Sequence, residues 1–243
     1  MNFLIDFFNL ILYRPLLNSL ILLYQYLPGH DFGLSVILLT VLIRLILYPL
    51  MSQSLKSQKA LSGLQSKIQE IQKKYVDDKE KQAKEMIGLY QKEKINPFSG
   101  LILVFLQLPI LIALYQVFWK GLRSEEMVNL YSFVAQPERI NPTFLGLVNL
   151  AEASLVLAIL AGIIQFFQIK LTLPQKEKGA EKTAPHQISG EGQFSDIFQK
   201  QMIYFFSIFT VLILLRLPAA ISLYWIATSL FSIMQQYFIF KKI

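Results

Sequence analysis

The stretch that decides the fold is FGLSVILLTVLIRLILYPLM, residues 32–51, which carries a single charge, on Arg44. About 20 mostly apolar residues are needed to cross roughly 30 Å of hydrocarbon as an α-helix. This stretch has the length and composition for that role, so we predict that it crosses a membrane.

Four further apolar stretches predict the same role for residues 98–119, 147–169, 202–217 and 218–240. Hydrophobic residues make up 54% of the chain and charged residues 16%, whereas a soluble domain carries roughly 25% charge. So much apolar sequence also excludes intrinsic disorder. The predicted fold class is all-α, with a five-helix transmembrane core over residues 31–240.

Lysine clustering predicts how this core is oriented. Residues 52–94 hold ten Lys, residues 170–200 hold five, and the chain ends with Lys241-Lys242-Ile243. Five crossings place all three segments on one side, and cytoplasmic loops are enriched in Lys and Arg. We therefore predict that the N-terminus lies outside and the C-terminus in the cytoplasm.

Residues 1–30 leave two interpretations open. Arg14-Pro15 divides them into two apolar pieces of roughly 18–20 Å each as helix, which is too short to span. We predict an amphipathic helix lying on the outer face. The alternative is one tilted span that tolerates Arg14, adds a sixth crossing and moves the N-terminus inside. A cleaved signal peptide is disfavoured, since no basic start precedes the apolar run.

Residues 52–97 are the long polar stretch between the first two spans. Apolar residues recur there at spacings of three and four, pause at Asp77-Asp78 and resume, which predicts an antiparallel helical hairpin in the cytoplasm. Its Lys residues either only set the topology of a solvated loop or form a cationic arm that docks partners. The apolar seam of the hairpin comprises Leu61, Leu64, Ile68, Ile71, Tyr75, Met86 and Tyr90.

Residues 172–200 lack an apolar period and predict a flexible cytoplasmic loop.

Arg44 is the candidate functional charge. It lies about 12 residues, or roughly 18 Å, from the outer end of its span, where a charge costs at least about 2.5–3.5 kcal/mol. The acid of another span, Glu152, lies near the outer end of its helix, so we do not expect the two to pair. Either a wet cavity open to the cytoplasm or snorkelling then accommodates Arg44.

Polar faces on the other spans favour the cavity. Thr40 lies one turn before Arg44 on the same face. Small polar residues often only mediate helix packing, but glutamine is costlier in lipid and is expected to face the interior. The polar positions are Gln107 in the second span, Gln165 and Gln168 in the third, and Ser222, Trp225 and Ser229, continued by Ser232 and Gln236, in the fifth.

The composition argues against an enzyme. The chain has no Cys and two His, which excludes disulfides and thiolate metal sites and leaves no basis for a histidine metal cluster. We find no nucleophile–base pair, carboxylate dyad or Gly-rich phosphate loop. We therefore predict no catalytic residue, no metal, no cofactor and no specific binding of nucleic acid.

Several ordered motifs resemble one family. They are GLSVILLTVLIRLILYPL at 33–50, EMIGLY at 85–90, LQLPILIALY at 106–115, LPAAISLYW at 217–225 and IMQQY at 233–237. Together they cover about residues 15–240 and resemble the YidC/Oxa/Alb family of membrane protein insertases. We expect this member to be without the large extracytoplasmic domain, the lipoprotein cysteine and the long basic tail of some members.

The resemblance implies a function and a set of site residues. It implies a hydrophilic groove open to the cytoplasm and inner leaflet, with Arg44 and Thr40 inside it. Expected partners are nascent membrane proteins, with the ribosome, the Sec translocon and membrane lipid beside them, in a bacterial plasma membrane. Rival classes are a small-solute transporter or anion channel with Arg44 as selectivity charge, and a membrane scaffold. The implied substrate-contacting residues are Gln107, Leu108, Pro109, Leu111 and Trp225.

Overall fold

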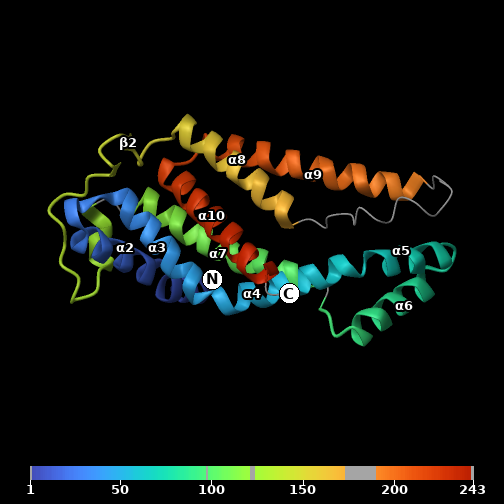
Figure 1. Cartoon of the computed structure of the whole chain (residues 1–243). Coiled ribbons are helices and arrows are strands. Elements are labelled where there is room, and N and C mark those ends of the chain that lie inside the picture. The colour runs from blue at the N-terminus through green and yellow to red at the C-terminus, as the bar shows by residue number, and fades with distance from the viewer. Residues whose placement is uncertain (1, 97, 121–123, 173–189, 242–243) are drawn as a thin grey trace.

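The molecule is built almost entirely of helices (Figure 1), and the computed structural model describes residues 2–96, 98–120, 124–172 and 190–241. Within those residues the only strands are β1 (Thr143–Phe144) and β2 (Val148–Asn149), which pair antiparallel. The all-α class predicted from the sequence is confirmed.

The N-terminal segment is one continuous helix, so the predicted division at Arg14-Pro15 is wrong. It comprises α1 (Asn2–Phe8), the π-turn η1 (Asn9–Tyr13) and α2 (Arg14–Tyr26). The π-turn shifts the backbone hydrogen bonds by one residue just before Pro15, so that Arg14 N donates to Asn9 O. Proline has no N–H to donate, and the π-turn lets the helix continue through it. A continuous helix is long enough to span, and whether it spans or lies on the outer face stays a prediction.

The stretch that decides the fold, residues 32–51, is bent and is not one straight helix. Helix α3 (Phe32–Ile46) ends before Leu47, and α4 (Tyr48–Gly63) continues at an angle of 67°. Pro49 lies in the first turn of α4. Its ring clashes with the carbonyl one turn earlier in an unbroken helix, so the chain begins a new helix there.

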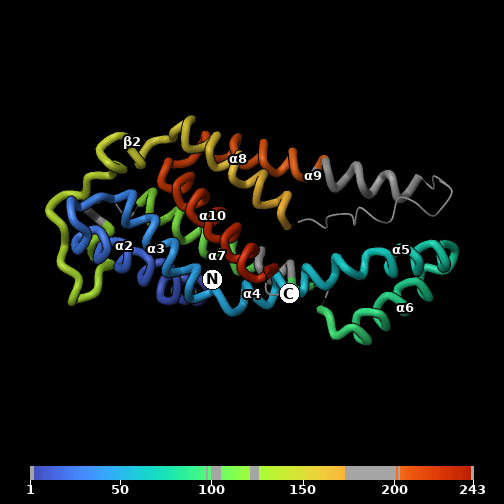
Figure 2. Tube along the Cα trace, in the orientation of Figure 1, coloured from blue at the N-terminus to red at the C-terminus, as the bar shows by residue number. Residues whose placement is uncertain are grey.

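A helical hairpin projects from the bundle, as Figure 2 shows. Helices α5 (Gln65–Lys74) and α6 (Lys79–Lys92) run antiparallel, and Asp78 caps α6 by accepting a hydrogen bond from Lys81 N at 2.9 Å. The break predicted at Asp77-Asp78 is therefore present. Within the predicted seam Leu64 is buried, and six residues are half-buried: Leu61, Ile68, Ile71, Tyr75, Met86 and Tyr90.

The remaining helices are α7 (Ser99–Trp119), α8 (Leu155–Thr172), α9 (Gly190–Leu214) and α10 (Ala219–Lys241). The third span begins later than the predicted residue 147. The chain from there to Ser154 is strand and turn, and Glu152 precedes the helix. The predicted flexible loop is wrong over 190–200, which is helical. Residues 173–189 of that loop lie outside the described residues.

Helix α10 occupies the centre of the bundle, between α3 and α8, and α9 packs on the far side of α8 (Figure 1). The connection between α7 and α8 folds back over α2 and the start of α3. There the ring of Phe144 covers Gly33 so closely that a Cβ on Gly33 would lie 2.2 Å from Phe144 Cδ2. Gly33 and Phe144 are therefore tightly packed against each other at this end of the bundle.

Length and composition allow two described helices to cross a membrane, Phe3–Tyr26 and Leu155–Thr172, and the bent pair α3 and α4 adds a third if it counts as one broken span. Two shorter apolar helices are Phe105–Trp119 and Ile203–Leu214. Helix α10 is not among them, and many of its buried side chains are polar, Ser222, Ser229 and Gln236 included. The exact number of crossings stays a prediction. Helices α8 and α9 expose many large apolar side chains, as expected of surfaces that face lipid: Val156, Ile163, Phe167, Tyr204, Phe205, Phe209 and Leu212.

Candidate functional site

Arg44 is buried on the inner face of α3, with 5% of its surface exposed. The bend after α3 brings α4 back toward it, so that Arg44 Nη1 lies 2.9 Å from Met51 Sδ. A thioether is a weak acceptor for a guanidinium. No carboxylate of the described residues lies within 4.0 Å of Arg44. Glu152, as expected, does not pair with it, because it is exposed and accepts a hydrogen bond from Asn149 Nδ2.

Two further side chains complete what we term the arginine cluster: Arg44, Met51, Gln107 and Tyr224. Tyr224 of α10 is buried and lies close enough to Arg44 to interact with it electrostatically. Its hydroxyl accepts a hydrogen bond from Gln107 Nε2 of α7. The cluster thus joins four helices, α3, α4, α7 and α10, around one charge.

A second group, which we term the glutamine cluster, joins α8 to the opposite side of α10. Gln165 Oε1 accepts hydrogen bonds from Trp225 Nε1 at 3.0 Å and from Ser229 Oγ at 3.2 Å. Two turns further along both helices, Gln236 Nε2 donates to Thr172 Oγ1 at 2.8 Å. Here the polar side chains satisfy one another across a helix interface.

The structure therefore divides the residues predicted for one groove between two places. Thr40 shares the buried face of Arg44, but its hydroxyl donates to Val36 O in its own helix. On α7, Gln107 points inward, whereas Leu108 is 49% exposed and Pro109 and Leu111 are half-buried. Neighbouring residues of a helix point about 100° apart, since a turn takes 3.6 residues. Four consecutive or near-consecutive positions cannot all meet Arg44.

Buried polar atoms without a partner mark the interior beside both clusters. Buried polar atoms are normally hydrogen-bonded, to protein or to ordered water. Five such atoms on α8 and α10 have no partner within the part of the chain that the structure describes. Ordered water is the usual partner of such buried polar atoms in proteins. The atoms are Gln168 Oε1, Ser222 Oγ, Thr228 Oγ1, Gln235 Oε1 and Gln236 Oε1.

Tyr224, Met51 and Gln235 are site residues that the sequence analysis missed. Gln235 Nε2 lies within hydrogen-bond distance of Tyr48 O and Ser52 Oγ, at 3.3 and 3.0 Å, and so ties α10 to the start of α4. Tyr224, Thr228 and Gln235 are spaced by four and seven residues, which is one helical face. That spacing was a readable signal of a second polar face on α10.

Comparison with known proteins identifies the family. The sequence model of the 60Kd inner membrane protein family matches residues 22–243. The chain belongs to this family. It is 32% identical over 212 residues to a membrane protein insertase YidC from Fusobacterium nucleatum, and the match covers 87% of each chain. It is 31% identical over 232 residues to the protein of the same name from Geobacter metallireducens. That match covers 95% of this chain but only 37% of the relative.

Membership in the 60Kd inner membrane protein family agrees with the structure. The family is one of inner membrane proteins and not of catalytic enzymes, and the apolar helices are those of a multi-pass member. A third relative named membrane protein insertase YidC, from Nitratidesulfovibrio vulgaris, is 28% identical over 229 residues, which are 94% of this chain and 38% of the relative. The shared region is thus a core that some relatives extend with a longer sequence.

Proposed function

We propose that this member of the 60Kd inner membrane protein family is a membrane protein insertase that receives nascent membrane segments at the arginine cluster. The single observation that carries the mechanism is a buried arginine with no carboxylate beside it among the described residues. The names of the relatives support insertion over solute transport.

The proposed mechanism shortens the distance that the polar flank of a substrate must cross through hydrocarbon. A polar flank of the substrate is attracted by Arg44 and solvated by water that the unpaired atoms of α8 and α10 hold. The adjoining apolar segment then partitions into lipid, and this transfer drives insertion. Leu108, on the exposed side of α7, and Trp225, half-buried on α10, are proposed to contact the apolar segment. The mechanism requires no covalent chemistry and no cofactor.

The test compares a substrate that carries Asp in its short outer tail with one that carries Asn. Wild type should insert the Asp substrate efficiently, and Arg44→Ala should impair that substrate most. Arg44→Lys should retain much of the activity, because it keeps the charge and loses only the planar fork. Equal insertion of both substrates by wild type and by Arg44→Ala would show that the charge has no part in the mechanism.

Topology is part of the proposal. We place the hairpin and the C-terminus in the cytoplasm and the connection between α7 and α8 outside. Because the chain has no Cys, single cysteines can be introduced at Lys79 and Gln136. An impermeant thiol reagent should label position 136 from outside and leave position 79 protected. Labelling of position 79 from outside would contradict this topology.

We also propose that the hairpin docks partners, among which the ribosome, the Sec translocon and anionic lipid are the candidates. Its seam holds the Lys-rich faces in place. Replacing Leu64, Ile68 and Ile71 with Ser should loosen the seam and reduce insertion, while the spans stay folded. Replacing the exposed Lys79, Lys84 and Lys92 with Gln tests the charge alone. Unchanged insertion by both variants would reduce the hairpin to a topological loop.

A further inference from the structure

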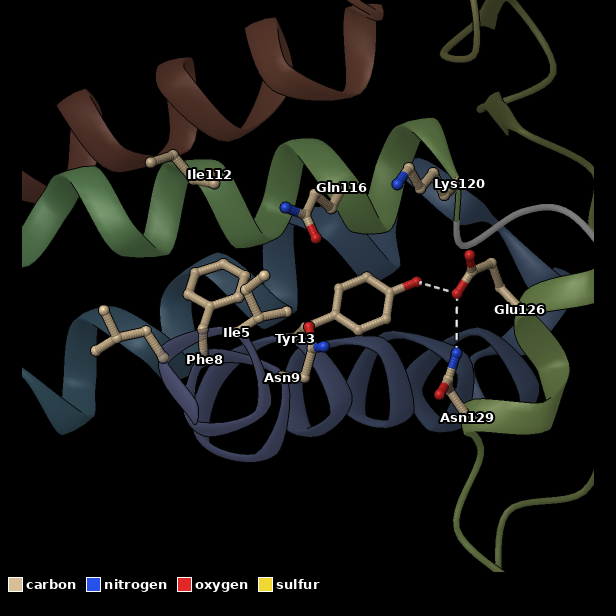
Figure 3. Close-up of a pocket in the computed structure, with 10 residues that line it drawn as sticks. Ile5, Phe8, Asn9, Tyr13, Ile112, Gln116, Lys120, Glu126 and Asn129 are labelled. Atoms are coloured by element: carbon tan, nitrogen blue, oxygen red, sulfur yellow. Dashed lines mark hydrogen bonds between the residues drawn. The ribbon is translucent and has the colours of Figure 1, made fainter. Parts of the chain in front are cut away.

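A cavity of about 560 Å³ lies between the N-terminal helix and the half of α7 that ends at Trp119 (Figure 3). One part of its wall is apolar, formed by Leu4, Ile5, Phe8 and Ile112. Leu4 and Ile112 are themselves largely exposed, so the cavity opens on an apolar surface of the molecule. In a membrane protein such an opening faces lipid.

The other end of the cavity carries two opposite charges. Glu126 Oε2 is held in place by hydrogen bonds from Tyr13 Oη at 2.7 Å and from Asn129 Nδ2 at 2.9 Å (Figure 3). Lys120 follows the last turn of α7 and is exposed. Within the described residues neither side chain has an ion-pair partner, since the one ion pair there joins Lys67 to Glu93. One cationic and one anionic group therefore border the same cavity without forming an ion pair with each other.

The π-turn helps to build this cavity. Asn9 and Tyr13, its first and last residues, both line the space, and single π-turns are frequent at functional sites. Leu4, Ile5, Phe8, Asn9 and Tyr13 all precede the region that matches the family, which begins at residue 22. The cavity thus depends on a part of the chain that the family match does not cover.

We propose that this cavity binds one zwitterionic phospholipid whose headgroup carries a primary ammonium. Lys120 pairs with its phosphate, Glu126 accepts hydrogen bonds from its ammonium, and an acyl chain lies against Leu4, Phe8 and Ile112. The charge pattern selects this occupant, because an anionic headgroup would leave its extra charge facing Glu126. A transmembrane segment of another protein would leave both charges unpaired.

The experiment measures lipid retention on the purified full chain by native mass spectrometry, with phosphatidylethanolamine, phosphatidylcholine and phosphatidylglycerol. Wild type should retain phosphatidylethanolamine about fivefold better than phosphatidylcholine, whose quaternary ammonium cannot donate a hydrogen bond. Glu126→Gln keeps an acceptor for Tyr13 and should abolish that preference. Lys120→Gln should weaken all three lipids, and Lys94→Gln, on the distant hairpin end, serves as the matched control.

Two results would overturn the proposal. One is equal retention of the three lipids by wild type, Lys120→Gln and Glu126→Gln. The other is capture of a polypeptide instead of lipid by a photo-crosslinker placed at Phe8. Because Lys120 is exposed, its substitution leaves the fold intact and keeps the test decisive even if Glu126→Gln is unstable.

Discussion

The two sides of α10 treat polar side chains differently. Toward α8, Gln165, Trp225 and Ser229 hydrogen-bond to one another across the interface. Toward α3, the arginine cluster gives its charge a sulfur atom and no carboxylate among the described residues. Satisfied polar groups stabilise helix packing in a membrane, whereas a charge left unpaired costs stability. The side of α10 toward α8 is suited to holding the bundle together. The side toward α3 is suited to attracting a polar substrate.

The largest effect on stability should come from the side of α10 toward α8, where the polar side chains are hydrogen-bonded to one another. Gln165→Leu leaves Trp225 Nε1 and Ser229 Oγ without an acceptor and should lower the free energy of unfolding in detergent by about 1–3 kcal/mol. Gln168→Leu is the matched control, because Gln168 Oε1 already has no partner. The comparison between the two sides fails if Gln165→Leu is no more costly than Gln168→Leu, or if it changes the preference for acidic substrate tails.

A smaller effect of opposite sign should come from the arginine cluster. Arg44→Met fills similar space without a charge and should raise the free energy of unfolding by about 1 kcal/mol. That is a fraction of the roughly 2.5–3.5 kcal/mol that a central arginine costs, because water compensates the rest in the proposed site. The same variant should lose its preference for acidic tails, as is common when a destabilised functional site is repaired. A less stable Arg44→Met would mean that Arg44 is structural.

The smallest effect belongs to an exposed pair on the hairpin. The hydrogen bond and the charge of Lys67 lower the pKa of Glu93. A lowered pKa means that the pair stabilises the hairpin above the ordinary pKa of Glu, and that this contribution is lost as the pH falls through the lowered value. In an NMR titration the pKa of Glu93 should lie below the ordinary value of a Glu carboxyl. Lys67→Gln should return its pKa toward that value, and an unchanged pKa would show that the pair does not persist in solution.

Periodicity and composition were sufficient to predict the helical class and the hairpin. Charge and apolar spacing act within one helix, so Asp78 could be recognised as the break and Thr40 as a neighbour of Arg44. The ends of helices were harder to predict. Apolar residues continue through Leu47 and across residues 147–154, and a stretch of uniform hydropathy does not reveal a bend or a short strand.

The π-turn and the division of the site could not be predicted from one sequence. Arg14-Pro15 predicts a helix end by ordinary rules, and only the shifted hydrogen bond from Arg14 N to Asn9 O shows how the helix continues. Similarly, Gln165 and Gln107 looked alike as polar residues within apolar spans. Which neighbour each one meets depends on how α8 and α7 pack around α10, and that is a tertiary property.

The contact between Gly33 and Phe144 has a consequence for how this sequence can vary. A methyl group at position 33 would meet the aromatic ring at 2.2 Å, so the two positions are sterically coupled although more than a hundred residues separate them. Gly33→Ala alone displaces the strand that carries Phe144, while Gly33→Ala combined with Phe144→Ala has room to be accepted. In an evolving lineage the two sites should therefore change together, with the loss of the ring preceding the gain of the methyl group.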